Sequence, residues 1–158
     1  MTLSITTPVN FSTFRADTVA ALLAVLNAYK AANPTKLKHL YTARPGSFPE
    51  LPCAYIGNRN ESITHDSGTR TRSLGPTVVL VDAFTDYAEQ TDRMDVLVDG
   101  LVEWFTANPR IIGTGAGTVL QMDGATDTEI ELAGATGPVF YRACVLTFGQ
   151  TEAQEGRN

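Results

Sequence analysis

The sequence has few cysteines and no long apolar run. Cys53 and Cys144 are its only two cysteines and form no C-x-x-C unit, so we expect reduced core thiols in a cytosolic protein. No apolar run approaches the length of about 20 residues that a membrane-spanning helix needs. Residues 1–15 lack the basic start and apolar centre of a signal peptide. We therefore expect no disulfide framework and no membrane partner.

Charge is also scarce, and it is unevenly distributed. Charged residues make up 18% of the chain, and the net charge is −5 at a pI of about 4.9. Residues 1–80 carry eight basic and four acidic residues, whereas residues 81–158 carry four basic and thirteen acidic residues. An acidic chain is a poor independent nucleic-acid binder. Halves of opposite charge favour head-to-tail contacts between copies; the alternative is that both sets of charges are solvated.

A first helix is predicted over residues 13–32. Its large apolar side chains recur at helical spacing, and it ends before Asn33-Pro34 because a residue that precedes proline disfavours the α conformation. The other face is rich in alanine and includes Ala21, Ala24 and Ala28. We interpret these three as a candidate subunit contact; the alternative is that alanine is simply the best helix former.

A second helix is predicted over residues 86–108. Leu97 and Leu101 belong to its apolar stripe, and carboxylates lie opposite them. This acidic row consists of Glu89, Asp92, Asp95, Asp99 and Glu103. Like charges at i+4 spacing destabilise a helix by a few tenths of a kcal/mol per pair. We therefore expect the row to contact a neighbouring subunit or to line a channel; a solvated face is the alternative.

A long polar arm is predicted over residues 57–75, between strands at 53–56 and 77–84. Only Ile63 and Leu74 are large and apolar in this segment, so it cannot fill a core. Loops of this length are uncommon in compact domains unless they are functional. We expect a hairpin whose candidate interface residues are Arg59, Ile63, Arg70 and Arg72.

The remaining strands are predicted at 37–42, 118–122, 128–132 and 139–148, with Asp123-Gly124 as a hairpin turn. The order of elements predicts an α+β fold with a mostly antiparallel sheet, two main helices packed on one face and the long polar hairpin arm. We expect one domain over residues 1–150 and a flexible C-terminal tail over 151–158.

Patterns that would carry catalysis are weak. The glycine-rich residues 113–117 follow a helix and precede a strand, which is the reverse of a phosphate-binding loop. Residues 65–67, His-Asp-Ser, are adjacent, whereas a catalytic triad must converge across a pocket. His39 has only lysines nearby, and a metal centre needs further ligands. We predict no catalytic, cofactor-binding or metal-binding residue, no cofactor and no enzymatic activity.

The order of these features resembles a known family. An alanine-rich helix, a polar arm between two strands, an acidic helix ending in Trp104-Phe105-x-x-Asn108-Pro109 and a closing hairpin with a polar tail follow one another along the chain. Over most of its length the chain resembles the tail terminator proteins of long-tailed, non-contractile bacteriophages, the siphophage tail completion family. The resemblance implies a small α+β protein that forms a homohexameric ring, caps the tail tube, stops its polymerisation and provides the head-joining surface.

The resemblance also implies partners and a location. The partners are further copies of the chain, the tail tube protein and the head–tail connector protein, with DNA passing through the channel without specific binding. The location is the virion tail, after assembly in the host cytoplasm. The family implies no catalytic residue. Two alternatives remain: another head–tail connector or tail tube component, and a small-molecule binding domain or enzyme, which would require a concave pocket.

Overall fold

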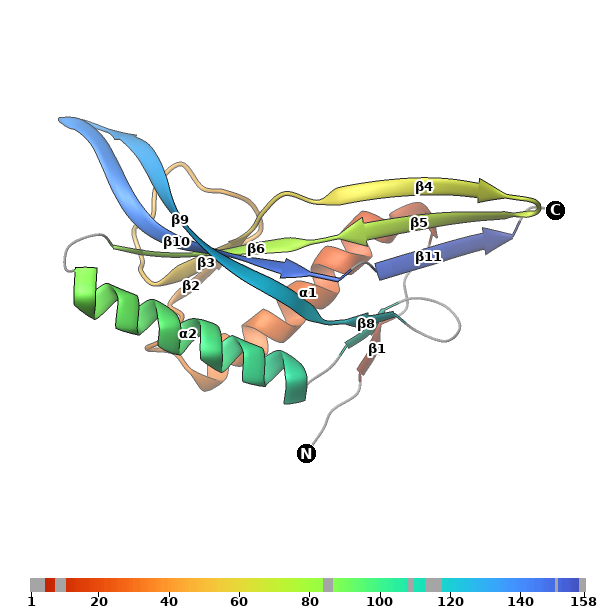
Figure 1. Ribbon diagram of the computed structural model, residues 1–158, viewed down its shortest axis with the longest axis horizontal. Helices are drawn as coiled ribbons and strands as arrows, with labels where there is room; N and C mark the ends of the chain where they lie inside the picture. Colours follow the sequence, from red (N-terminus) through yellow and green to blue (C-terminus); the bar gives the residue numbers. More distant parts are fainter. Residues whose placement is uncertain are drawn as a thin grey trace.

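Two helices cover one face of a five-stranded sheet, and smaller sheets extend from it (Figure 1). The computed structural model describes the backbone of residues 5–7, 11–83, 87–107, 110–112, 118–149 and 151–156. It describes the side chains of 11–83, 93–107, 121–149, 152, 153 and 155. With its two helices and mostly antiparallel strands, the structure confirms the predicted α+β class.

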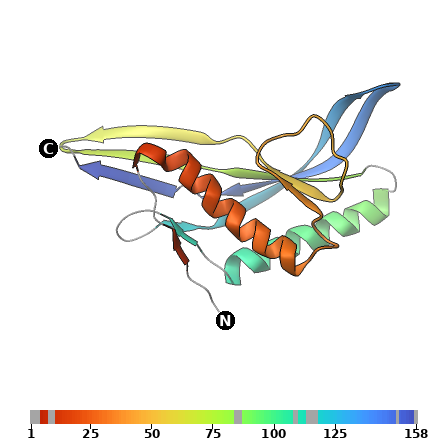
Figure 2. The same cartoon turned by 180° about the vertical axis from the view of Figure 1, so that it is seen from behind.

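The helices lie within two residues of their predicted limits. A 3₁₀ turn over Phe11–Thr13 leads into α1, Phe14–Ala32, and α2 covers Tyr87–Ala107. The backbone N–H of Asn33 donates to the carbonyl of Tyr29 at 2.9 Å and closes the last turn of α1 before Pro34. Figure 2 shows α1 lying across the sheet and meeting α2 near the C-terminal end of α1.

The central sheet has the strand order β2-β3-β6-β10-β9. Only β2 and β3 are parallel, and the other three pairs are antiparallel. The bounds are His39–Tyr41 for β2, Cys53–Ile56 for β3, Thr77–Ala83 for β6, Met122–Gly134 for β9 and Gly137–Phe148 for β10. Beyond the other strands, β9 and β10 continue as a long hairpin that projects from one end of the molecule (Figure 1).

Alternate residues of the sheet pack in two apolar layers. Leu80 and Leu146 are fully buried beneath both helices, against residues such as Leu101. Val81 faces the opposite layer, which Phe48 of the β2–β3 connection covers. The unbroken run of apolar side chains in β6, from Val78 to Val81, therefore reflects burial on both faces.

Both cysteines are buried and unpaired, as the sequence predicts. Cys53 lies in the layer under Phe48, and Cys144 lies in the layer under the helices. Burial raises the pKa of Cys53 to about 12 and that of Cys144 to about 11. Because the thiolate is the reactive form, these thiols are structural and unreactive at neutral pH.

The predicted arm exists, but it has three strands. β4 covers Asn60–Asp66, β5 covers Thr69–Gly75, and the turn between them uses Gly68 at φ +84°. The third strand, β11, covers Thr151–Gly156 and pairs antiparallel with β5. The prediction of a flexible tail over 151–158 is therefore wrong for these residues, because backbone pairing with β5 holds them. Residues 157 and 158 lie outside the described part of the chain.

A third, small sheet joins β1, Ile5–Thr7, to β7, Arg110–Ile112, and β8, Thr118–Leu120. β1 and β7 run parallel, and neither was expected as a strand. The glycine-rich residues 113–117 lie outside the described residues, so the structure does not test their interpretation as a connector.

The predicted turn at Asp123-Gly124 is wrong. β9 continues through both residues, and the true hairpin turn is at Ala135-Thr136. Opposite Asp123-Gly124, the register shifts between Thr147 and Phe148 of β10, so that one residue of β9 is unpaired. A glycine within a strand often marks such a bulge.

Removal of β11 tests whether it stabilises the arm. The deletion of residues 150–158 removes Ala153, which is 1% exposed in the core beside Leu74. We expect the free energy of unfolding to fall by about 1–3 kcal/mol, and amide hydrogen exchange in β5 to accelerate. Thermal unfolding and hydrogen-exchange mass spectrometry measure both effects. Unchanged exchange in β5 would contradict the pairing with β11.

Candidate interface surfaces

The base of the arm is fastened to the start of α1 by an ionic network. Glu61 of β4 accepts a hydrogen bond from Arg72 Nε at 2.6 Å and forms an ion pair with Arg15 of α1. Arg72 also donates to the carbonyl of Phe11 at 2.7 Å. The arm therefore has a defined orientation relative to the helices.

Two of the four predicted interface residues of the arm face the subunit itself. Arg70 pairs with Glu155 of β11, and its guanidinium lies 5.0 Å from the centre of the Phe11 ring. Arg72 belongs to the network at the base. Arg59 and Ile63 are instead exposed, and Ile63 is 54% exposed. These two are the predicted arm residues that remain on the outer surface.

The Glu61 carboxyl has a lowered pKa. Burial raises this pKa, but the hydrogen bonds and charges of Arg15 and Arg72 together outweigh burial. A pKa that is lowered on folding contributes stability above the unfolded value, 4.5 here, and that stability is lost as the pH falls through the folded value. The network should therefore weaken in acid.

Glu61→Gln should lower the urea midpoint at pH 7. The difference from wild type should shrink as the pH falls from 4.5 through the lowered pKa of the folded protein, below which the wild-type carboxyl is also neutral. Glu103→Gln, at an exposed position of α2, is the matched control. A difference of the same size at pH 7 and pH 3 would contradict the ionic role of Glu61.

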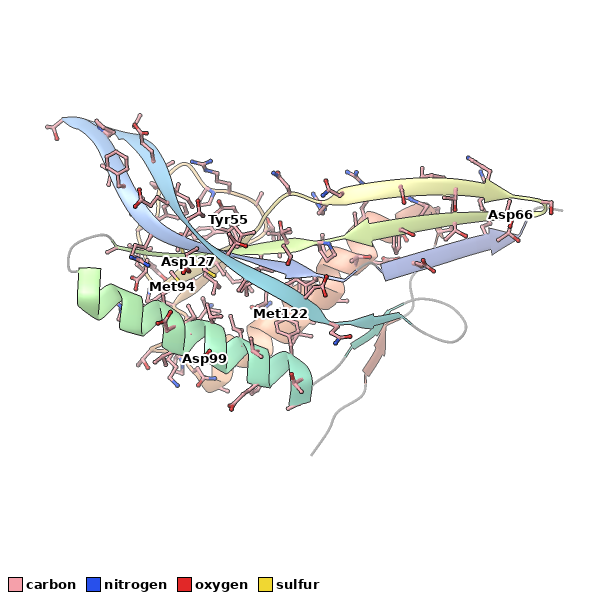
Figure 3. All side chains as sticks on the ribbon, viewed as in Figure 1. Tyr55, Asp66, Met94, Asp99, Met122 and Asp127 are labelled. Atoms are coloured by element: carbon pink, nitrogen blue, oxygen red, sulfur yellow. The ribbon has the colours of Figure 1, made fainter. Side chains whose placement is uncertain are left out.

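The acidic row lies on the outer side of α2 where its side chains are described. Asp95, Asp99 and Glu103 are exposed, and none forms an ion pair with a described residue. Figure 3 shows Asp99 on α2, and Val96, within the same face, is 52% exposed. Glu89 and Asp92 belong to α2, but their side chains lie outside the described set. The apolar stripe of α2 is confirmed on the opposite side, where Leu97 and Leu101 are buried.

Arg93 of α2 has an intramolecular partner that the sequence analysis missed. Its Nε donates to Asp82 Oδ2 at 2.8 Å, and a second guanidinium nitrogen contacts Oδ1. Asp82, in β6, is 1% exposed and also accepts from the N–H of Ala83. This ion pair fastens α2 to the sheet.

The alanine face of α1 is only partly available to a partner. Ala21 is 1% exposed and belongs to the core, so its prediction as a subunit contact is wrong. Ala24 is half-buried and Ala28 is exposed. The helix is rotated so that Ala21 joins the buried stripe, and the exposed remainder of this face consists of Ala20, Ala28, Ala31 and Ala32.

A groove lies where the C-terminal half of α2 meets the end of α1. It has a volume of about 470 Å³ and is lined by Tyr29, Ala32, Asn33, Lys36, Gly100, Glu103, Trp104 and Ala107. Trp104 Nε1 donates to the carbonyl of Val25 at 3.2 Å, and its ring meets the Tyr29 ring edge-on at 5.7 Å. A Cβ at Gly100 would lie 2.7 Å from the Tyr29 hydroxyl. A glycine in the interior of a helix, here Gly100 of α2, is the sequence signal for the close approach of α2 to Tyr29 of α1.

The described residues contain no group of three or more His, Cys, Asp or Glu side chains that could hold a metal ion. Of the helices whose residues are described, none is long and apolar enough to span a membrane. His65, Asp66 and Ser67 lie at the end of β4 and its turn, and Asp66 is at the tip of the arm (Figure 3).

Comparison with known proteins gives a similar structure but no family. No family model matches the sequence, and no curated protein matches it. Chains of solved structures are similar to it. One of them comes from a structure titled "Virion of native gene transfer agent (GTA) particle". That chain has a TM-score of 0.43 and 12% identity, and the alignment covers 83% of this chain and 94% of that one.

Proposed function

We propose that the protein is a phage tail terminator, a structural subunit that forms a ring on the end of the tail tube. The observation that carries the proposal is the arm. It has three paired strands and an ionic anchor, yet six of the seven residues of β4 are exposed. A segment that is firmly held and buries little of its own surface is suited to contacting another molecule.

The rest of the surface supports an assembly role. The arm and the β9–β10 hairpin project from opposite ends of the subunit (Figure 1), and the two halves of the chain carry opposite net charge. Projections at both ends suit head-to-tail contacts, which close into a ring when the rotation between copies allows it. The acidic row would line the channel and repel the phosphates of passing DNA.

The proposed role is structural, not catalytic. The partners are other copies of the chain, the tube protein and the head–tail connector protein, and the proposed location is the virion tail. The ring would cap the tube, stop its growth and present the head-joining surface.

A tube-growth assay tests this function. Purified protein should form a species of about six subunits at high concentration or on tubes, as measured by light scattering and native mass spectrometry. Addition to polymerising tube protein should stop elongation and give shorter tubes. A protein that stays monomeric and does not bind tubes would contradict the proposal.

Two other functions are separated by the same assay. A tube component would be incorporated and lengthen tubes, and a head–tail connector would bind heads without stopping growth. The remaining alternative is a small-molecule site in the groove between the helices. The volume of this groove falls within the range of ligand pockets. A monomer or dimer whose melting temperature rises with a small ligand would favour that alternative.

A further inference from the structure

The outer edge of the arm is an unpaired strand edge. β4 is the last strand of the three-stranded arm, and no described strand pairs with its other side (Figure 1). It contains neither lysine nor proline, which commonly keep a strand edge from pairing with another molecule. Six of its seven residues are exposed, so the described chain covers little of this strand. An edge of this kind can accept a further strand from outside.

The register of the arm determines which backbone groups point outward. The two-residue turn at Ser67-Gly68 is flanked by a hydrogen-bonded pair, and such pairs alternate with non-hydrogen-bonded pairs along an antiparallel hairpin. Counted back from the turn, Glu61, Ile63 and His65 occupy the non-hydrogen-bonded positions. Their N–H and C=O groups therefore point away from β5, along the outer edge of β4.

The sequence of β4 is complementary to itself when two copies run antiparallel about Ile63. In this register Ile63 lies opposite its counterpart in the second copy. Glu61 then lies opposite His65, and Ser62 lies opposite Thr64. An apolar pair, a carboxylate beside an imidazole, and two hydroxyl-bearing side chains are favourable cross-strand neighbours. No two like charges lie directly opposite each other along the strand.

The exposed apolar side chain of the arm selects this register. Ile63 is 54% exposed, and it is the one exposed large apolar residue among the described residues of the arm. A shift of two residues in either direction would place it opposite Glu61 or His65. The register about Ile63 instead buries two apolar side chains against each other, and such burial is what fixes the pairing of strands.

The other long edge among the described strands is unsuited to self-pairing. β9 is the last strand on its side of the central sheet, and its exposed residues include Asp127, Glu129 and Glu131. Two such edges would bring carboxylates together, and like charges opposite each other are destabilising. Arg44 also donates to the carbonyl of Glu131 at 3.4 Å. β4 is therefore the edge that fits a second copy.

We propose that two copies of the protein pair through their β4 edges, so that the three strands of each arm form one six-stranded sheet. Glu61, Ile63 and His65 of each copy would each donate one backbone hydrogen bond and accept one, which gives six bonds across the junction. The contact uses the same surface on both copies and has a two-fold axis at Ile63. It goes beyond the proposed function, whose ring requires head-to-tail contacts, and does not depend on it.

Sedimentation velocity over a range of concentrations tests the dimer. Wild type should form a species of two subunits. Ile63→Lys should weaken that species by about tenfold or more, because two lysines would meet at the centre of the junction. Position 63 is exposed, so the variant should fold. Val96→Lys, at a 52% exposed position of α2, is the matched control and should keep the dimer.

Cysteine cross-linking tests the register. A mixture of Ser62→Cys and Thr64→Cys should form a disulfide on mild oxidation, because a non-hydrogen-bonded antiparallel pair has its Cα atoms about 4.5 Å apart. Either variant alone should cross-link far more slowly, because equivalent positions of the two copies are about 8 Å apart, beyond the reach of a disulfide. Cys53 and Cys144 are buried and should not compete.

The outcomes separate this contact from the proposed function. Wild type without a dimer, or a dimer that Ile63→Lys leaves unchanged, would overturn the contact. Equal cross-linking by the single variants and by the mixture would also overturn it. If wild type stayed monomeric in solution while Ile63→Lys lost binding to tail tubes, the β4 edge would serve the tube protein and not a second copy. The tube-growth assay is a separate measurement, so the proposed function can stand when the dimer fails.

Discussion

Replacement of Arg93 with alanine should lower the free energy of unfolding by about 3 kcal/mol. The substitution leaves the Asp82 carboxylate buried at 1% exposure without its guanidinium partner. Removal of one member of a buried ion pair is strongly destabilising because the remaining charge is uncompensated. Because the Arg93 side chain is itself 48% exposed, solvent partly screens the ion pair. The expected loss therefore lies at the lower end of the range for removing one member of a buried ion pair. Urea denaturation at pH 7 measures it.

Two further variants isolate the role of this ion pair. Asp99→Ala, at an exposed position of the same helix, should change stability by no more than about 0.5 kcal/mol. Arg93→Lys keeps the charge but loses the two-point contact with Asp82, so its stability should be intermediate. If Arg93→Ala is as stable as wild type, the ion pair does not fasten α2 to the sheet.

If the protein forms the proposed ring, charge reversal in the acidic row should turn that ring into a DNA binder. Asp95→Lys combined with Asp99→Lys moves the net charge from −5 to −1, since each substitution adds two charges. Both positions are exposed, and the change relieves like-charge repulsion along the helix, so the subunit should remain folded. If the row lines the channel, the variant ring should bind duplex DNA about tenfold or more tighter than wild type at low salt, with affinity falling steeply as salt rises.

A variant of equal net charge tests whether the position of the added lysines matters. Glu50→Lys combined with Asp66→Lys gives the same net charge at exposed positions outside α2, and it should bind DNA less well if position matters. Fluorescence anisotropy at two salt concentrations compares the two proteins. Arg70 and Arg72 pair within the subunit, so a contact between the row and these arginines of a neighbour would require those pairs to break. Unchanged assembly, DNA binding and infectivity would mean that the row is a solvated face.

The helices and the buried strands could be predicted because their signals are local. The stripe of α1 and the stop at Asn33-Pro34 fix that helix to within a residue of its limits. β6 is recognised from its run of β-branched residues, of which the three valines are each buried on one face or the other. In these segments, periodicity and propensity agree with the tertiary environment.

The missed elements depend on distant partners. β11 has a polar sequence, Ala153 is the buried one among its three described side chains, and the segment becomes a strand only because the edge of β5 lies beside it. β1 likewise pairs in parallel with residues more than a hundred positions away. At Asp123-Gly124 a turn dipeptide marks a bulge, because the twelve paired positions between β9 and β10 outweigh the local turn preference.

The candidate surfaces were predictable as residue types but not as contacts. The carboxylates of α2 were expected on the outside, and Asp95 and Asp99 are exposed. The partners of Arg70, Arg72 and Arg93 come from elements distant in sequence, so no spacing rule could reveal that they are paired. The Tyr29 hydroxyl is buried without a hydrogen-bond partner among the described residues, and this is equally invisible in a sequence, where Tyr29 is one member of an apolar stripe.

The late position of β11 in the chain sets the order in which the arm can mature during protein synthesis. β4 and β5 emerge from the ribosome long before β11, which follows every other described strand. Until then the outer arm is a two-stranded hairpin, and such hairpins are only marginally stable in water. The three-stranded form of the arm is therefore complete only after translation has passed residue 156, and nascent or truncated chains would carry an unfinished arm.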